Sequence, residues 1–156
     1  MALLALFFSG VYESVIVGLR VANASDERES IRQQLAHAMD LLTREGGVAS
    51  NVDNAEDQRF QFDGDIDGDG STNNNINYQV SSGDLQRVYS GNTVTLVKDL
   101  TSLDFDYVDL NGSNMTTPVT PAGTRDNIRV VQVTMTATSD QETISMTSAI
   151  YLRNNR

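Results

Sequence analysis

The first 45 residues carry a hydrophobic pattern that changes twice along the segment. Residues 1–8 form an unbroken apolar run, residues 9–24 remain mostly apolar, and residues 25–45 are charged with regularly spaced apolar positions. The pair Gly46-Gly47 follows, and glycine closes a helix C-terminus at little cost because it adopts the left-handed backbone conformation. The pattern therefore predicts one long helix that ends near residue 46.

The second half of this predicted helix has one apolar face. Ile31, Leu35, Ala38 and Leu42 follow one another at steps of four, three and four, which is the spacing of an apolar stripe on a helix. We expect these side chains to form the core between the helix and the rest of the chain. Residues 25–156 are accordingly predicted to form one globular domain.

After the glycines the hydrophobic period changes from 3.6 to 2, which is typical of β-strands with one buried face. The segments with this pattern are rich in Val, Ile, Thr, Tyr and Phe, and they are residues 59–62, 76–80, 85–89, 93–97, 103–108, 128–137 and 143–152. Short turns between neighbouring segments indicate an antiparallel meander. The predicted fold class is α+β, with a long N-terminal α-helix packed on an antiparallel β-sheet.

Residues 1–24 have more apolar side chains than one small domain can cover. The whole predicted helix over residues 1–45 extends about 70 Å, roughly twice the width of a domain of this size, so part of it must pack against something other than its own body. The apolar side chains of residues 1–24 cover most of the circumference, so we expect other molecules to bury this part on all sides. The predicted assembly residues are Leu3, Leu4, Leu6, Phe7, Phe8, Val11, Val15, Ile16 and Leu19. The competing interpretation is a core helix within a globular domain, against which the length argues.

Residues 63–71 read Asp-Gly-Asp-Ile-Asp-Gly-Asp-Gly-Ser, with a carboxylate at every second position. Hard oxygen ligands, with glycines where the loop turns, are typical of calcium-binding loops. The candidate Ca²⁺ ligands are Asp63, Asp65, Asp67, Asp69 and Ser71. The alternative is a solvated acidic turn between two strands.

Two registers of this loop fit a calcium site, one led by Asp65 and the other by Asp63. Neither register ends in the glutamate that closes an EF-hand loop. A full EF-hand is therefore not expected. The ligand that completes the site would come from Asn73, Asn75 or a distant carboxylate such as Asp84.

Composition and charge exclude several functions. The net charge of −10 and the 11 scattered Lys and Arg argue against binding to nucleic acid, which requires clustered basic residues. The chain has no cysteine, so disulfides, thiol catalysis and cysteine metal sites are impossible. His37 is the only histidine, Asp104 and Asp106 have the pattern of a solvated strand face, and a catalytic triad is not expected. We therefore expect a protein that is not an enzyme.

The features follow one another in a recognisable order. They are the hydrophobic N-terminal helix, its amphipathic continuation over residues 31–45, the paired segments of residues 76–87, and residues 103–112 and 149–154. In this order the chain resembles type IV pilin-like proteins over nearly its whole length, and most of all the W-type minor pilins and the J-type pseudopilins of type II secretion.

The resemblance implies a structural subunit of a type IV pilus or of a type II secretion pseudopilus. Such a subunit polymerises with other pilin or pseudopilin subunits through its hydrophobic N-terminal helix, here residues 1–24. The resemblance also implies residence in the bacterial inner membrane before assembly, with the globular domain in the periplasm, and then in an extracellular filament.

The start of the chain departs from the pattern of that family. The family's basic leader, the glycine before its processing site, the phenylalanine after it and the glutamate at the fifth mature position are absent. Residues 1–6 resemble the middle of the family's hydrophobic helix, so we expect Met1 to be an internal methionine with about ten mature residues before it, enough to complete a membrane span. Alone, residues 1–8 reach only about 12 Å.

A second function also fits the sequence. The chain would then be a secreted or surface-tethered calcium-binding β-domain that binds a ligand through residues 111–126, the long predicted loop that holds both prolines. Filament formation that needs residues 1–24 would favour the filament subunit. Monodisperse behaviour of the whole chain would favour the β-domain.

Overall fold

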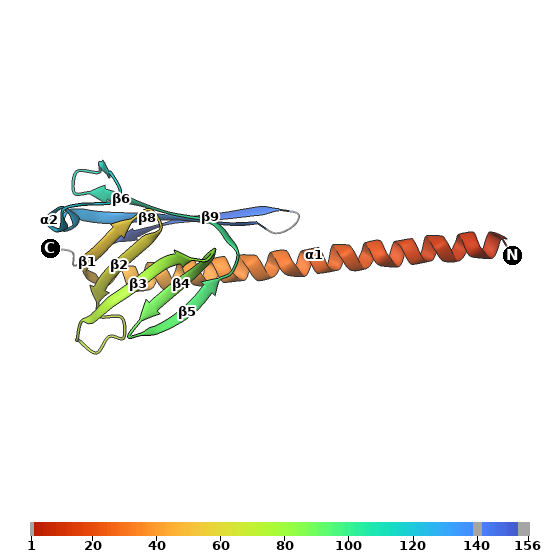
Figure 1. The fold of residues 1–156 in the computed structure, drawn as a ribbon, viewed down its shortest axis with the longest axis horizontal. Helices are drawn as coiled ribbons and strands as arrows, with labels where there is room; N and C mark the ends of the chain where they lie inside the picture. The colour runs from red at the N-terminus through yellow and green to blue at the C-terminus, as the bar shows by residue number, and fades with distance from the viewer. Residues whose placement is uncertain (1, 139–141, 153–156) are drawn as a thin grey trace.

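A computed structural model describes residues 2–138 and 142–152 of the chain. Helix α1 (Ala2–Gly46) leaves the β-rich body and carries the N-terminus far from it (Figure 1). At its other end, the backbone N–H of Gly47 donates to the carbonyl of Thr43 at 3.0 Å, and the chain turns into the first strand. The helix therefore ends at the two glycines that the pattern singled out.

The strands form two antiparallel sheets. The five-stranded sheet has the order β1 (Ala49–Glu56), β2 (Arg59–Gly64), β3 (Asn73–Ser81), β4 (Asp84–Tyr89) and β5 (Asn92–Val97). The four-stranded sheet has the order β7 (Asn114–Met115), β6 (Leu100–Asp109), β8 (Ile128–Thr138) and β9 (Thr143–Tyr151). A short helix, α2 (Ala122–Arg125), lies between β7 and β8 along the chain.

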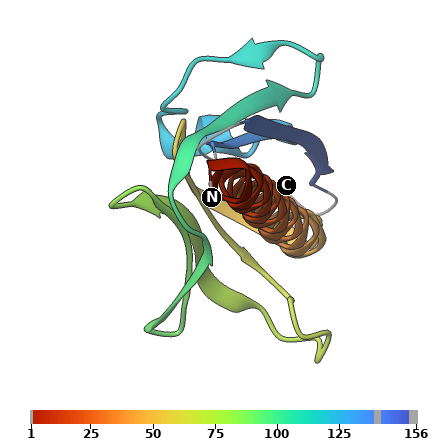
Figure 2. The same ribbon diagram turned by 90° about the vertical axis from the view of Figure 1, so that its right-hand side faces the viewer.

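The prediction of an α+β fold with the helix packed on one sheet is wrong. The body is mostly β and has two sheets in a sandwich-like arrangement, and α1 contacts strands of both, chiefly β9 and β5. Figure 2 shows the helix lying in the angle between the sheets. A helix is about 10 Å wide and strands lie about 4.8 Å apart, so one helix covers about two strands. The apolar faces of the remaining strands are therefore buried against one another.

Aromatic side chains fill the space between the two sheets. The ring of Phe60 in β2 lies 5.8 Å from that of Phe105 in β6, centroid to centroid. The buried Tyr107 of β6 donates its hydroxyl to the carbonyl oxygens of Glu56 and Arg59, at 3.0 and 3.2 Å. Burial, together with nearby acidic side chains, raises the pKa of Tyr107 above its ordinary value. These contacts join the β1–β2 hairpin of one sheet to a central strand of the other.

The C-terminal half of α1 packs into this core through its apolar stripe. Leu35, Ala38 and Leu42 are fully buried, and Ile31 and Met39 are partly buried against the same core. Each fully buried leucine side chain stabilises the fold by about 1.5–3 kcal/mol. The stripe predicted from the spacing is therefore the face that lies between the sheets.

A buried ion pair holds the end of α1 to the five-stranded sheet. Glu45 accepts hydrogen bonds from Nε and Nη2 of Arg87 in β4, at 2.8 and 2.9 Å, and from the hydroxyl of Tyr78 in β3 at 2.7 Å. Burial and the bond to Glu45 raise the pKa of Tyr78. Burial opposes the charge of Arg87, but Glu45 outweighs it, so the pKa of the guanidinium lies above its ordinary value. The helix end is thus locked in position by charge and packing together.

Strand β1 was not predicted, because its sequence Ala-Ser-Asn-Val-Asp-Asn-Ala-Glu holds a single β-branched residue. It pairs with β2. It also accepts hydrogen bonds from the long segment that joins β6 to β8. In that segment the N–H of Val119 donates to the carbonyl of Ala55 at 2.9 Å, and Nε of Arg125 donates to the carbonyl of Val52 at 3.0 Å. Tertiary contacts rather than local propensity make this strand.

Candidate functional site

The N-terminal part of α1 exposes large apolar side chains to solvent. The side chains that are between 55% and 68% exposed are Tyr12, Val15, Val17, Leu19 and Val21. They follow one another on a helix that has left the body, as Figure 1 shows. Such a run of exposed apolar side chains is unusual for a protein that acts alone and is typical of a surface that binds a partner.

The predicted assembly residues divide into two groups in the structure. Val15 and Leu19 are exposed, and Ile16 is partly buried. The side chains of the others, Leu3, Leu4, Leu6, Phe7, Phe8 and Val11, lie outside the part of the structure that is described. Across the described residues, no helical stretch combines the length and the apolar character that crossing a bilayer requires.

Residues 12–21 are poor helix formers when water surrounds them. Val15, Ile16, Val17 and Val21 are β-branched, and such side chains lose rotamer freedom in a helix. Gly18, where a side chain would meet nothing within 4 Å beyond its own stretch of helix, costs about 1 kcal/mol relative to alanine. Most helical stability in proteins comes from packing of an apolar face, so packing of this segment against another surface would stabilise it as a helix.

The acidic loop lies between β2 and β3, and it gathers three carboxylates. Asp65, Asp67 and Asp69 each offer one oxygen, and these oxygens lie within 4.8 Å of one another. Ligands of a calcium-sized ion lie about 2.4 Å from it, so two opposed ligands are about 4.8 Å apart. The triad could therefore hold one metal ion.

Backbone N–H groups hold the loop in this shape. Asp65 accepts hydrogen bonds from the N–H of Gly68 at 2.8 Å and of Gly70 at 3.0 Å, and Asp69 accepts one from the N–H of Ser71 at 2.7 Å. Gly68 and Gly70 have φ values of 76° and 87°, a region that residues with a side chain rarely adopt. The glycines thus allow the loop to fold back on its own carboxylates.

Asp63 does not join the triad. Its carboxylate accepts the N–H of Asn75 at 2.8 Å and faces Asn51 and Asp53 across the β1–β2 pair. Burial and the charge of Asp63 raise the pKa of Asp53 above its ordinary value. Of the two predicted registers, the geometry favours the one led by Asp65, in which Gly70 forms the turn.

The residues considered for closing the site lie at different places. Asn73 is adjacent, since its Nδ2 donates to Asp67 at 3.4 Å and to the hydroxyl of Tyr89 at 2.8 Å. Asn75 accepts a hydrogen bond from Gln61 at 2.7 Å instead. Asp84 begins β4 at the far end of the β3–β4 hairpin and accepts the N–H of Asp99. Asn73 is thus the neighbour that the structure brings to the triad.

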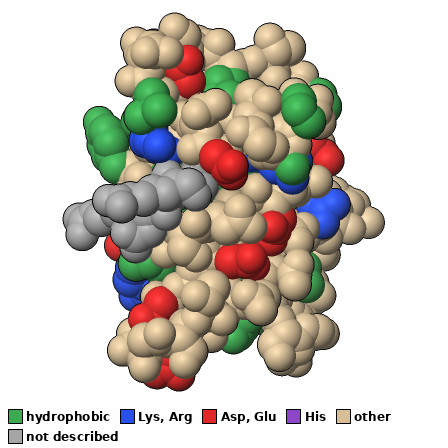
Figure 3. All heavy atoms as spheres, turned by 90° about the vertical axis from the view of Figure 1, so that its left-hand side faces the viewer, with side chains coloured by type: hydrophobic (Ala, Val, Ile, Leu, Met, Phe, Trp, Pro, Cys, Tyr) green, Lys and Arg blue, Asp and Glu red, His purple; other side chains and the backbone are tan. Residues whose placement is uncertain are grey.

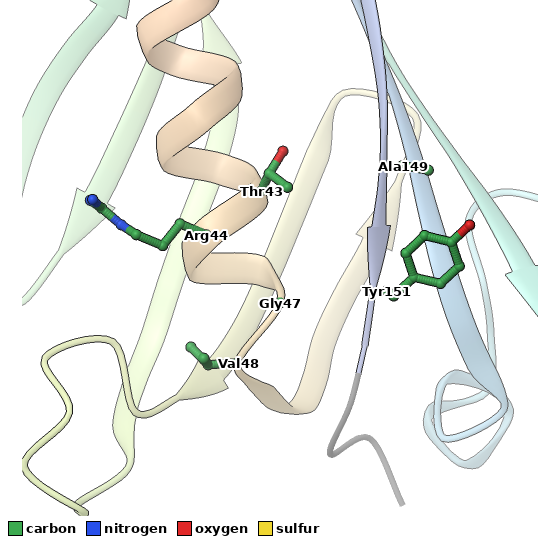
Figure 4. A pocket seen from close by; sticks show the side chains of 6 residues that line it. All are labelled: Thr43, Arg44, Gly47, Val48, Ala149 and Tyr151. Carbon is green, nitrogen blue, oxygen red and sulfur yellow. The ribbon is translucent and has the colours of Figure 1, made fainter.

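A hollow of about 300 Å³ lies between the end of α1 and β9. It is lined by Thr43, Arg44, Gly47, Val48, Ala149 and Tyr151. Figure 4 shows the Arg44 side chain leaving to one side of the helix and the Tyr151 ring lying beyond β9, so their polar groups do not converge. None of the residues predicted as candidate sites lines this hollow, and its polar groups do not form a pair of nucleophile and base.

The end of the body opposite the N-terminus has a different surface. Figure 3 shows acidic and basic side chains scattered over this face, with hydrophobic side chains in small separate groups on its visible part. The exposed apolar surface described above therefore belongs to α1 and not to this end of the body.

The buried Glu45, Arg87 and Tyr78 cluster was missed by sequence reasoning, because its members are far apart along the chain and each is unremarkable alone. The helix and the acidic loop are thus the two predicted sites from which a function can be inferred. Comparison with models of known protein families and with curated protein sequences finds no match for this chain.

Proposed function

We propose that the chain is a structural subunit of a bacterial filament, a type IV pilus or a type II secretion pseudopilus, and that it polymerises through α1. The observation that carries the proposal is the helix itself. It leaves the body with Tyr12, Val15, Val17, Leu19 and Val21 exposed. The described side chains of the body include single exposed large apolar residues, whereas those of the helix recur every two or three positions from Tyr12 to Val21.

Association would remove this surface from water. Full burial of a valine or leucine side chain is favourable by about 1.5–3 kcal/mol. The same contacts would hold residues 12–21 in a helix that water alone does not favour. Assembly therefore supplies both the burial and the tertiary contacts that this segment lacks in the single subunit.

In the same proposal, the subunit resides in the inner membrane before it enters the filament. The apolar residues of positions 1–24 support this, because they surround the helix rather than one side of it. Fractionation of native cells tests it: the subunit should remain with membranes after alkaline carbonate washing and leave them with detergent. Recovery of the whole pool in the aqueous fraction would overturn the membrane stage.

Replacement of apolar residues on the helix tests polymerisation directly. The doubly substituted variant Val15→Gln with Leu19→Gln introduces glutamine, a good helix former, at both positions and removes their apolar surface. The unchanged chain should pellet as filaments at high speed and appear as such by electron microscopy, while the variant should stay in the supernatant at the same concentration.

A matched control comes from the body. Val94 and Leu110 are 50% and 60% exposed, so Val94→Gln with Leu110→Gln removes a similar apolar surface elsewhere. The control should assemble like the unchanged chain. Equal assembly of all three proteins, or a monodisperse unchanged chain in detergent-free buffer, would refute polymerisation through α1.

We further propose that the ion held by the Asp65, Asp67 and Asp69 triad is Ca²⁺. The donors are all carboxylate oxygens, which suit hard cations, and the loop is irregular and glycine-rich, which suits the variable coordination of Ca²⁺ better than the strict octahedron of Mg²⁺. The carboxylates repel one another without a cation. Binding would therefore tighten the connection between β2 and β3.

Calorimetric titration with Ca²⁺ and Mg²⁺ tests this assignment. One Ca²⁺ should bind per chain, Mg²⁺ more weakly, and Asp67→Asn should abolish binding of both. Asp104→Asn is the control, because Asp104 is an exposed strand carboxylate outside the triad. Absence of binding to the unchanged chain, or unchanged binding in Asp67→Asn, would contradict the site.

The acidic triad also favours the second function, a secreted or surface-tethered calcium-binding β-domain. That function needs no polymerisation. A chain that binds Ca²⁺ and stays monodisperse in the pelleting experiment would favour it over the filament subunit.

A further inference from the structure

The outer face of the five-stranded sheet carries mostly amide side chains where β2 and β3 pair. Phe60, Ile76 and Tyr78 of these strands are buried in the core, so the alternate residues point outward. Asn, Gln and Arg occupy most of the outward positions, and pairing with β1 and β4 extends the set on both sides. We call this surface the amide face; its residues are Asn54, Arg59, Gln61, Asn75, Asn77, Gln79 and Gln86.

Arg59 lies at the centre of a hydrogen-bonded network on the amide face. Its Nη2 donates to Oε1 of Gln61 at 2.7 Å, and Nε2 of Gln61 donates to Oδ1 of Asn75 at 2.7 Å. In the other direction, Nε of Arg59 donates to Oδ1 of Asn77 at 3.2 Å, and Nδ2 of Asn77 donates to Oε1 of Gln79 at 2.8 Å. The network therefore orients these side chains before any ligand binds.

The amides stand at positions where they disfavour the strand. Asparagine is depleted in β-strands, yet β3 has four asparagines among its nine residues. Asn77 is only 7% exposed, so the fold also bears the cost of withdrawing its amide from water. Proteins break local rules of this kind mainly at functional sites, so the amide face is a candidate binding surface.

The free groups of the network are chiefly hydrogen-bond donors. No ion pair joins Arg59 to a described carboxylate, so its charge polarises the amides that follow it in the network. At the two ends, the side-chain N–H groups of Asn75 and Gln79 donate to none of the described residues. A ligand that supplies oxygen acceptors would complete the network.

The other groups on this face narrow the class of ligand. Glu56 lies opposite Arg59 and Asp63 lies further along β2, and the chain has a net charge of −10, so an anionic polymer would be repelled. A protein partner would need an apolar or aromatic anchor, and Val88 is the one apolar residue that the described strands β2 to β4 place here. A neutral ligand whose hydroxyls both accept and donate hydrogen bonds meets these conditions.

We propose that the amide face binds a neutral polysaccharide, which lies across β2 and β3 and exchanges hydrogen bonds with the amides through its hydroxyls. Because the network already orients the side chains, binding does not have to order them. This function does not depend on polymerisation through α1. A filament would display many such faces and gain avidity, but a single dispersed subunit already carries a complete face.

Electrophoresis of the dispersed subunit in native gels tests the proposal, because polysaccharide dissolved in the gel retards even a weakly bound protein. At least one of two neutral polymers, hydroxyethylcellulose and galactomannan, should retard the unchanged chain, and the polyanion alginate should not. Gln61→Met with Gln79→Met removes two amides at nearly constant shape. This variant should need at least about tenfold more polymer for the same retardation.

A second variant, Gln79→Glu, still accepts the hydrogen bond from Asn77 but offers no donor to a ligand, so it should also weaken retardation. The matched control is Thr134→Val with Thr147→Val on the outer face of the other sheet. It removes a pair of hydroxyls 3.0 Å apart at constant shape and should bind like the unchanged chain. Circular dichroism confirms which variants are folded.

Three results would overturn the proposal: no retardation of the unchanged chain by either neutral polymer, retardation by alginate alone, or equal retardation of the control and the folded amide variants. Polymerisation through α1 would stand in each case, because it is judged by the Val15 and Leu19 variant in the pelleting experiment. Failure of that polymerisation would in turn leave the binding of the dispersed subunit to polysaccharide unaffected.

Discussion

The two halves of α1 have the same backbone conformation and opposite surroundings. From Ile31 to Gly46 the helix lies between two sheets, with Leu35, Ala38 and Leu42 fully buried. The N-terminal part of the helix has left the body (Figure 1), and between Tyr12 and Val21 it exposes valine, leucine and tyrosine side chains. The C-terminal half is a core element of the chain itself, whereas in the proposed filament the N-terminal half would be buried by other subunits.

The comparison shows that hydrophobicity alone does not say where a side chain will be buried. Leu42 and Leu19 are the same residue in one helix, yet one is fully buried and the other is 59% exposed. Their difference lies in the presence of a sheet beside the helix. Substitutions in the two halves should therefore act on different properties, folding in one and assembly in the other.

Leu42→Ala should produce the largest loss of folding stability, about 4 kcal/mol, because it removes a buried side chain and leaves a cavity. Leu19→Ala should leave the unfolding free energy of the dispersed subunit within about 0.5 kcal/mol of the unchanged chain and weaken assembly instead. Urea denaturation of both variants checks this. Equal losses of stability would break the distinction between the halves.

Glu45→Ala should lower the unfolding free energy by about 3 kcal/mol, because it leaves the guanidinium of Arg87 without its buried partner. Glu29→Ala is the control in the same helix, since Glu29 is exposed and accepts only the amide of Gln33 at 3.1 Å. Thermal unfolding of the two variants gives the comparison. A Glu45→Ala protein as stable as the Glu29→Ala protein would show that the helix end is held by packing alone.

Alkaline pH should weaken the body through Tyr78 and Tyr107. Burial raises the pKa of both hydroxyls above the ordinary value of 10.0, so above pH 10 the folded chain retains protons that the unfolded chain loses. Stability is therefore complete below pH 10 and falls as pH rises, by about 1.4 kcal/mol per pH unit for each tyrosine. Urea denaturation at pH 9, 10 and 11 measures the slope. Tyr107→Phe should reduce it, and an unchanged slope would contradict the assignment.

Gly18→Ala should have the smallest effect. It should stabilise the helical conformation of the N-terminal half of α1 by about 1 kcal/mol and leave the body unchanged. Alanine favours the helix more than glycine does, and the new Cβ would meet no atom within 4 Å beyond its own stretch of helix. Far-ultraviolet circular dichroism of the dispersed subunit should show a gain of helix, with the urea midpoint of the body unchanged. A loss of helix would indicate a conformation at Gly18 that alanine cannot adopt.

Patterns that depend on neighbouring residues were readable from the sequence. The period of Ile31, Leu35, Ala38 and Leu42 gave the buried face of α1, and the spacing of Asp65, Asp67 and Asp69 gave the acidic triad. Both follow from local geometry, because the spacing of residues in a helix or loop determines the direction in which their side chains point.

Features that depend on pairing across the chain were not readable. The alternation of apolar residues in β5 and β6 is the same whether they share a sheet or not, so the division into two sheets was missed. Strand β1 has a single β-branched residue, and Asp63 accepts the N–H of Asn75 across the strands rather than bonding to its neighbours in sequence. Such contacts depend on which strands pair with one another, and the spacing of residues along the chain does not indicate this pairing.

Amide hydrogen exchange of residues 12–21, compared with residues 35–45, measures the central claim most directly. In the dispersed subunit, residues 12–21 should exchange rapidly while residues 35–45 are protected. In sedimented filaments, both segments should be protected. Filaments in which residues 12–21 still exchange rapidly would contradict polymerisation through the N-terminal half of α1, as would a dispersed subunit that already protects both segments equally.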